Sequence, residues 1–252
     1  LKTYTSSMGY DPQELQDKTG IPVVALNYGN LTALRPSLYD SLRLMGQIIG
    51  KVQRAEDVIT FIESTIADLK RRTTDIPEGM RPTVFLGGVA FKGPHGFQST
   101  EPSYPPFQFI NATNLAYDSS FSQLELSNTN VSKEQIVAWD PDYLFLDLAT
   151  LQMGEDAGGL HELKTDPAYS LLSAIDNDRV FGVLPYNWYT ANYGSILANA
   201  YFIGKTLYPD RFKDIDPRHK ADEIYTFLVG KPVYSLMETS FQHLVFKPVP
   251  VK

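Results

Sequence analysis

The stretch SKEQIVAWDPDYLFLD, residues 132–147, contains the pattern that decides the fold. Ser132, followed three positions later by Gln135, is typical of a capping box at the start of a helix. Asp140-Pro141-Asp142 ends this helix, because proline cannot continue it and aspartate favours turns. The apolar run 143–148 then predicts a buried strand. A helix that leads straight into a buried strand indicates a parallel α/β sheet.

The same alternation continues on both sides of this stretch. Asp11-Pro12 is typical of an N-cap followed by a first-turn proline. The other predicted elements are a helix over 11–19, a strand over 21–26, a strand over 83–86, a helix over 166–175, a strand over 179–184 and a helix over 193–207. Together they predict a mostly parallel sheet with helices on both faces.

Between Pro36 and Arg72 an apolar residue recurs every three or four positions, as in an amphipathic helix. Gly46 and Gly50 predict a break, after which one long helix runs from about Ala55 to Arg72. At 1.5 Å per residue this helix would span roughly 25 Å, long enough to support two lobes. The expected domains are the remainder of an N-terminal α/β lobe at 1–50, a connecting long helix at 51–75 and a C-terminal α/β lobe at 82–252.

The composition narrows the functional classes. The net charge of −7 argues against a nucleic-acid partner, which usually requires a basic surface. The absence of cysteine excludes zinc–thiolate sites, disulfides and cysteine nucleophiles. No apolar run approaches the roughly 18 residues that a membrane-spanning helix needs.

In parallel α/β sheets, ligands bind beyond the carboxyl ends of the strands. The first candidate loop there is 4–10, which precedes the first predicted helix. Its small hydroxyl residues and glycine leave backbone N–H groups open to an anionic or carbonyl-bearing ligand. The candidate contacts are Ser6, Ser7, Met8 and Tyr10. An ordinary loop with helix-capping serines is the alternative.

The second candidate loop, 91–101, follows the strand that ends at Gly87-Gly88. It combines a cation, an imidazole, two hydroxyls and the carboxylate of Glu101, and the candidate contacts are Lys92, His95, Ser99 and Thr100. His95 is suited to hydrogen-bond a ligand carboxylate or to contact a metal ion. The four histidines show no paired metal-ligand spacing, so no other direct metal contact is expected, and a structural histidine is the alternative.

The third candidate loop, 185–193, follows the last predicted strand. Its aromatic rings and amides suit a flat, partly polar ligand, and the candidate contacts are Tyr186, Trp188, Tyr189 and Asn192. The alternative is a buried aromatic cluster that caps the helix over 193–207.

Enzyme signatures fit the sequence poorly. There is no Gly-x-Ser-x-Gly elbow and no phosphate-binding loop. An α/β hydrolase that uses Ser99 or a pair of carboxylates stays open as an alternative, although nothing selects one pair. We expect a protein without catalytic residues.

Several segments resemble the substrate-binding proteins of iron-siderophore, haem and cobalamin ABC importers. The helix, Asp-Pro-Asp turn and strand of 132–145 look like a signature of that family, as does 168–181. The region 38–72 is similar to its connecting helix. The segments 91–104 and 185–210 resemble an iron-complex subgroup, which adds Tyr104 to the expected ligand contacts.

This resemblance implies a non-catalytic, extracytoplasmic protein that captures a siderophore-, haem- or corrinoid-like chelate between two lobes. It would deliver the chelate to an ABC permease, docking through Glu134, and would act as a monomer. It implies no resident cofactor, since a metal such as iron or cobalt arrives with the ligand. A membrane anchor would lie in a segment absent from this sequence, and family members carry further strands and helices before the position of Leu1. The alternative to transport is the ligand-sensing domain of a membrane receptor.

Overall fold

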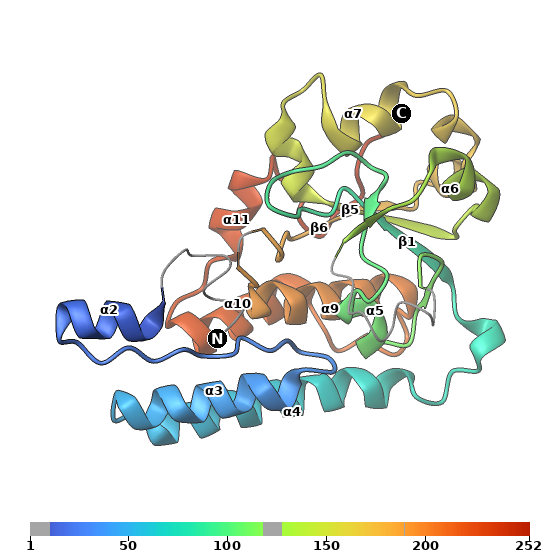
Figure 1. Cartoon of the computed structure of the whole chain (residues 1–252). Coiled ribbons are helices and arrows are strands. Elements are labelled where there is room, and N and C mark those ends of the chain that lie inside the picture. Colours follow the sequence, from blue (N-terminus) through green and yellow to red (C-terminus); the bar gives the residue numbers. More distant parts are fainter. Residues whose placement is uncertain (1–10, 118–127, 189) are drawn as a thin grey trace. The chain divides into compact units, whose positions relative to one another are not determined.

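The computed structural model describes residues 11–117, 128–188 and 190–252 (Figure 1). The chain consists of two compact units, unit 1 (Leu1–Phe61) and unit 2 (Ile62–Lys252). The long helix α4 (Val52–Thr73) begins in unit 1 and ends in unit 2, over the stretch where the connecting helix is predicted.

None of the helices in the described ranges is both long and apolar enough to cross a membrane.

The first helix of unit 1, α2 (Pro12–Thr19), begins as predicted. The side chain of Asp11 accepts hydrogen bonds from the backbone N–H groups of Gln13 and Glu14, and a proline occupies the first turn. Gly20 ends the helix with a φ of 65°, a conformation that glycine adopts without strain.

The helix α3 (Arg35–Ile48) packs against the first turns of α4. Gly46 allows this close approach, because a Cβ there would lie 2.9 Å from the Cβ of Ala55. Arg43 of α3 also pairs with Glu56 of α4, with 2.7 Å between the Nε and carboxylate oxygen.

The strand predicted over 21–26 is wrong. Residues 22–30 have no regular secondary structure, and Ile21 and Val24 are 65% and 51% exposed. None of the residues described between 11 and 61 forms a strand, so among them this apolar run finds no strand to pair with. An apolar segment becomes a strand only when a second strand satisfies its backbone hydrogen bonds.

Unit 2 is built on a four-stranded sheet in which every pair of neighbours is parallel. The strand order is β3-β1-β5-β6, with bounds β3 (Thr113–Asn114), β1 (Thr83–Gly87), β5 (Tyr143–Asp147) and β6 (Val180–Val183). The predicted strands over 83–86, 143–148 and 179–184 are therefore confirmed. The register places Leu86 opposite Phe145 and Leu144 opposite Val180, which gives the sheet an apolar interior.

Helices cover both faces of this sheet. In Figure 1, α9 and α10 lie below the sheet, while α6 and α7 lie above it. The elements that complete unit 2 are η1 (Glu78–Met80), β2 (Ser99–Thr100), α5 (Pro105–Phe109), β4 (Thr129–Asn130), α6 (Lys133–Trp139), η3 (Leu148–Met153), α7 (Gly158–Thr165), η4 (Tyr169–Leu171), α8 (Ser173–Asp176), α9 (Tyr193–Leu207), α10 (Pro217–Val229) and α11 (Tyr234–Ser240).

Local capping explains where α6 and α9 begin, and the sequence predicts the first of these two caps. Ser132 Oγ accepts the N–H of Gln135, and Asn192 Oδ1 accepts the N–H of Ser195. The single helix expected over 166–175 is wrong, because η4 and α8 replace it. Leu172 between them has an extended backbone, and the carboxylate of Asp140 accepts the N–H of Ser173.

The C-terminal tail covers the open edge of β6. Gly182 donates its N–H to the carbonyl of Lys247, and Val249 donates to Val180. An uncovered edge strand offers unpaired backbone groups to other chains, so the tail satisfies these groups within the molecule.

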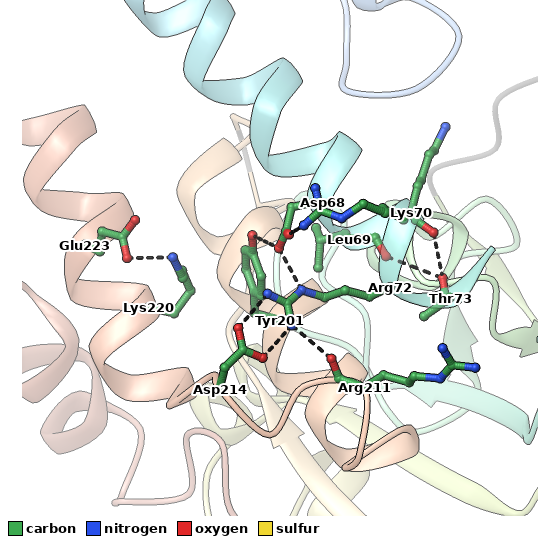
Figure 2. A network of polar contacts seen from close by, with 11 residues as sticks. Asp68, Leu69, Lys70, Arg72, Thr73, Tyr201, Arg211, Asp214, Lys220 and Glu223 are labelled. Carbon is green, nitrogen blue, oxygen red and sulfur yellow. Dashed lines mark hydrogen bonds and ion pairs between the residues drawn. The ribbon is translucent and has the colours of Figure 1, made fainter. Parts of the chain in front are cut away.

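Within unit 2, Arg72 attaches the last turns of α4 to the segment that precedes α10 (Figure 2). Its guanidinium forms two hydrogen bonds with Asp214, at 2.7 and 2.8 Å, and a third with Asp68 at 2.8 Å. It also donates to the carbonyl of Arg211 and lies over the ring of Phe212. The Arg72 guanidinium lowers the pKa of Asp214 to about 2.

We predict that Arg72→Met destabilises the protein by about 1–2 kcal/mol, because it removes the ion-pair partner of Asp214 and one of the partners of Asp68. Chemical denaturation near neutral pH measures this loss. Arg71→Met is the matched control, since Arg71 also pairs with Asp68 but its side chain is 72% exposed, against 15% for Arg72. Equal effects of the two substitutions would contradict the anchoring role of Arg72.

Candidate ligand-binding site

The carboxyl ends of β1, β5 and β6 lie along one edge of the sheet, where the sequence places two of its candidate loops. Gly88 makes the first turn there with a φ of 77°. The chain then runs through 91–101, while 184–192 leaves β6 toward α9. Ligands of open α/β sheets bind beyond such an edge, so these loops are the candidate site.

A backbone hydrogen bond joins the tips of the two loops. The N–H of Lys92 donates to the carbonyl of Trp188 over 3.1 Å. Lys92 has a φ of 56°, an uncommon conformation for a residue with a side chain. Phe91 and Lys92 are exposed, with the Lys92 ammonium 5.4 Å from the centre of the Phe91 ring, and Trp188 is half-buried. The structure thus brings Lys92 and Trp188 together.

His95 stabilises its own loop. Its Nε2 lies 2.9 Å from the carbonyl oxygen of Phe91, and its own carbonyl accepts the hydroxyl of Thr150. One ring nitrogen is thus used within the loop. Among residues 11–117, 128–188 and 190–252, no group of three or more His, Asp or Glu residues could hold a metal ion. A metal or ligand contact of His95 stays a prediction.

The base of the 184–192 loop is fixed by two asparagines. Asn199, inside α9, accepts the N–H of Leu184 and donates to its carbonyl, at 3.0 and 2.8 Å. Asn192 donates its N–H to the carbonyl of Tyr186 and accepts the hydroxyl of Tyr225. Asn192 is exposed at the end of this loop, and its contact with a ligand stays a prediction.

Below the two loops lies a buried polar cluster formed by Glu101, Tyr104, Asp147 and Tyr186. The hydroxyl of Tyr186 donates to Glu101, and Tyr104 accepts a hydrogen bond from Asn199 at 3.0 Å. Glu101 and Asp147 are only 4% and 2% exposed. Tyr104 and Tyr186 therefore support the loops from inside, and their direct contact with a ligand stays a prediction.

Burial changes the protonation of both carboxyl groups. It raises the pKa of Glu101 to about 8, an effect that the hydrogen bond from Tyr186 opposes and the charge of Asp147 increases. Burial raises the pKa of Asp147 to about 7, although the backbone N–H groups of Ala149 and Ala90 favour its ionised form. Near neutral pH the cluster thus holds protons that exposed carboxylates would release.

Ser99 and Thr100 form β2 and lie in the interior. Ser99 Oγ donates to the carbonyl of Val89 at 2.7 Å and accepts the amide of Asn128 at 2.6 Å. Neither partner is a base, so the geometry gives no support to a nucleophilic Ser99. Thr100 Oγ1 is buried without a hydrogen-bond partner within the described part of the chain. Ligand contact of both hydroxyls stays a prediction.

The remaining predicted contacts are placed as follows. Ser6, Ser7, Met8, Tyr10 and Tyr189 lie outside the described residues. Glu134 is exposed in the first turn of α6, where the helix dipole stabilises a carboxylate. Its docking role stays a prediction.

Sequence reasoning missed Asn199 and did not assign Glu101 or Asp147 to the site. Asn199 sits in an apolar helix between Ala198 and Ala200, and a polar residue at such a position needs a buried partner. That signal could have identified it as a support for a neighbouring loop. No sequence signal shows that Glu101 and Asp147, 46 positions apart, lie in one cluster.

A second polar region surrounds the Arg72 network, where a pocket of about 470 Å³ lies between α4, α9 and α10. Two ion-paired groups lie in its lining: Arg72 with Asp214 and Asp68, and Lys220 with Glu223 at 2.6 Å (Figure 2). Asp216, also in the lining, caps α10 by accepting the N–H groups of Arg218 and His219. Because these side chains hold elements of the fold, the network explains attachment of helices rather than recognition of a ligand.

A model of the periplasmic binding protein family matches residues 4–185. The comparison with curated proteins gave no match.

Solved structures show the same fold. A periplasmic solute-binding protein from Veillonella parvula aligns with a TM-score of 0.64 and 20% identity, over 92% of this chain and 66% of its own. The molybdate-binding protein MolA of Haemophilus influenzae, solved with molybdate, aligns at 0.65 and 16%, over 87% and 69%. The haem-binding protein HutB of Vibrio cholerae aligns at 0.55 and 20%, over 78% and 72%. The chain thus spans 66–72% of the length of these three proteins.

We predict that stability falls as pH rises through the neutral range, because the fold favours the neutral form of Asp147. The stabilisation is complete below the ordinary pKa of 3.8 and is lost as pH rises through about 7. In Asp147→Asn, the decrease in the free energy of unfolding between about pH 4 and pH 8 should be smaller than in the wild type by at least about 1.4 kcal/mol, which corresponds to a tenfold change in the folding equilibrium. Urea denaturation across this range measures it.

The control for this experiment is Asp156→Asn, which removes an exposed carboxylate. Its pH dependence should match the wild type. A wild-type pH profile in Asp147→Asn would show that the buried carboxyl does not retain its proton.

Proposed function

The chain belongs to the periplasmic binding protein family, and we propose that it is the extracytoplasmic ligand-binding component of an ABC importer. It captures a metal chelate and delivers it to a permease without catalysing a reaction. The observation that carries this proposal is the contact between Lys92 and Trp188, which joins two loops at the carboxyl edge of a parallel sheet. In open α/β folds, this edge is where small molecules bind.

The chemistry of the two loop tips supports a chelate as the ligand class. Phe91 and Trp188 offer flat apolar surfaces to an aromatic or macrocyclic group, and Lys92 offers a positive charge to a carboxylate or another anionic group. Siderophore-, haem- and corrinoid-like chelates combine such features. The metal, such as iron or cobalt, belongs to the ligand, and the protein carries no resident cofactor.

Two structural neighbours support this range of ligands. HutB of Vibrio cholerae binds haem, and MolA of Haemophilus influenzae was solved with molybdate. A small oxyanion is therefore the second candidate ligand, and Lys92 is the residue that favours it. The alternative of a hydrolase gains no comparable support, since Ser99 lacks a base and both carboxylates of the cluster are buried.

We expect a panel of ferric siderophore, haemin, cobalamin and molybdate to contain one ligand that binds tightly. Trp188→Ala should raise the Kd of a flat chelate at least about tenfold, or about 1.4 kcal/mol, because the ring loses its contact area. Lys92→Gln should weaken an anionic ligand by a similar factor. Isothermal titration calorimetry measures both.

The matched control is Trp139→Phe, since Trp139 lies at the end of α6, outside both loops. It should keep wild-type affinity. If no member of the panel binds, or if Trp188→Ala and Lys92→Gln both bind as the wild type does, these loops are not the ligand site.

We propose that the protein, as a monomer, docks on its permease through Glu134. This exposed carboxylate stands in the first turn of α6, held in place by the Ser132 cap. Glu134→Arg should lower ligand-dependent transport at least about tenfold while leaving ligand affinity unchanged, because docking and capture use different surfaces.

Uptake by cells that express the permease with each variant measures this effect. Glu155→Arg is the control, because Glu155 is another exposed glutamate of unit 2 and makes the same charge change. Equal uptake by Glu134→Arg and the wild type would contradict the docking role.

A further inference from the structure

Several contacts among the described residues hold the 184–192 loop. Leu184 and Trp188 are held through their backbone groups, and Asn192 caps α9 and accepts the hydroxyl of Tyr225 at the end of the loop. Nearer its middle, Tyr186 donates its hydroxyl to the carboxyl group of Glu101. This is a buried contact between two side chains that lie 85 positions apart in the sequence.

Hydrogen bonds to the main chain fix the position of Glu101. Asn114 of β3 donates its side-chain amide to the carbonyls of Glu101 and Pro102, at 3.2 and 3.0 Å. The N–H of Tyr104, at the start of α5, also donates to the carbonyl of Glu101. The sheet thus fixes Glu101, and Glu101 in turn contacts the loop that carries Trp188.

The groups that act on Glu101 come from each element around it. Asp147 ends β5, Tyr104 begins α5 and Tyr186 belongs to the loop after β6. None of these three is a cation. While Glu101 is protonated, its contact with Tyr186 buries no charge. When the Glu101 carboxyl ionises, it places a negative charge beside Asp147.

We propose that Glu101 is a positioning residue of the ligand site, which fixes the Trp188 loop through its hydrogen bond with Tyr186. The proposal rests on the proposed function, since it takes this loop as the one that faces the ligand. Below about pH 8, the value to which burial raises the pKa of Glu101, the loop is held against the sheet. Above it, the ionised carboxyl draws water into the cluster and the loop loosens.

The test uses Trp188 as the reporter. The chain has two tryptophans, so Trp139→Phe leaves Trp188 as the single fluorophore, and Asp147→Asn removes the second buried carboxyl group that titrates in this pH range. In this background we expect the acrylamide quenching constant of Trp188 to rise at least about twofold between pH 6 and pH 9. Glu101→Gln keeps an acceptor for Tyr186 but cannot ionise, so its quenching should stay low at both pH values.

Two further variants remove the contact itself. Glu101→Ala and Tyr186→Phe should show high quenching at both pH values, while circular dichroism shows the fold intact. Glu155→Gln, which changes an exposed carboxylate, should keep the wild-type pH profile. Rescue by glutamine together with loss of the pH response distinguishes positioning from a merely structural role. A wild-type pH response in Glu101→Gln, or wild-type quenching in Glu101→Ala, would overturn the proposal.

Binding of haemin and molybdate to the same variants separates this proposal from the proposed function. We expect affinity for the probe that binds to fall at least about threefold from pH 6 to pH 9 in the wild type, and to stay constant in Glu101→Gln. If neither probe binds while the quenching of Trp188 still changes in the Glu101 variants as expected, the ligand class fails and the positioning role stands. If a probe binds and Glu101 variants change neither quenching nor affinity, the positioning role fails alone.

Discussion

All strands of the four-stranded sheet run parallel, so their carboxyl ends lie along one edge. Every loop that leaves β1, β5 or β6 must begin there. The chain returns from this edge through helices that cover the two faces, and loops far apart in sequence meet. The hydrogen bond between Lys92 and Trp188 is a direct consequence, since it joins the segment after β1 to the segment after β6. The candidate site thus depends on the direction of the strands.

The same edge also directs polar side chains into the interior. Asp147 ends β5 and Glu101 follows β2, and both are buried beside the aromatic rings of Tyr104 and Tyr186. Burying two carboxyl groups with no cation among their described partners costs free energy unless they stay protonated. The cluster also supports the loops 91–101 and 184–192 from inside, and a binding site needs such a rigid support.

The Arg72 network and the candidate ligand-binding loops occupy different parts of unit 2. The Arg72 network attaches the last turns of α4 to the 211–214 segment, and the C-terminal tail completes the edge of β6. Both lie among elements that carry none of the predicted ligand contacts. Substitutions of Phe91, Lys92 or Trp188 therefore leave these stabilising contacts in place.

The sequence by itself determined the local elements: the Asp11 and Ser132 caps, the Asp-Pro-Asp stop and the apolar runs of β1, β5 and β6. These depend on neighbours within a few residues, so their signals are written in short patterns. Only the tertiary structure decided which residues meet. It placed Glu101 beside Asp147 and Tyr186, paired Asn199 with Leu184, and left residues 22–30 without a strand. Burial and strand pairing depend on partners distant in sequence, and no short pattern records those partners.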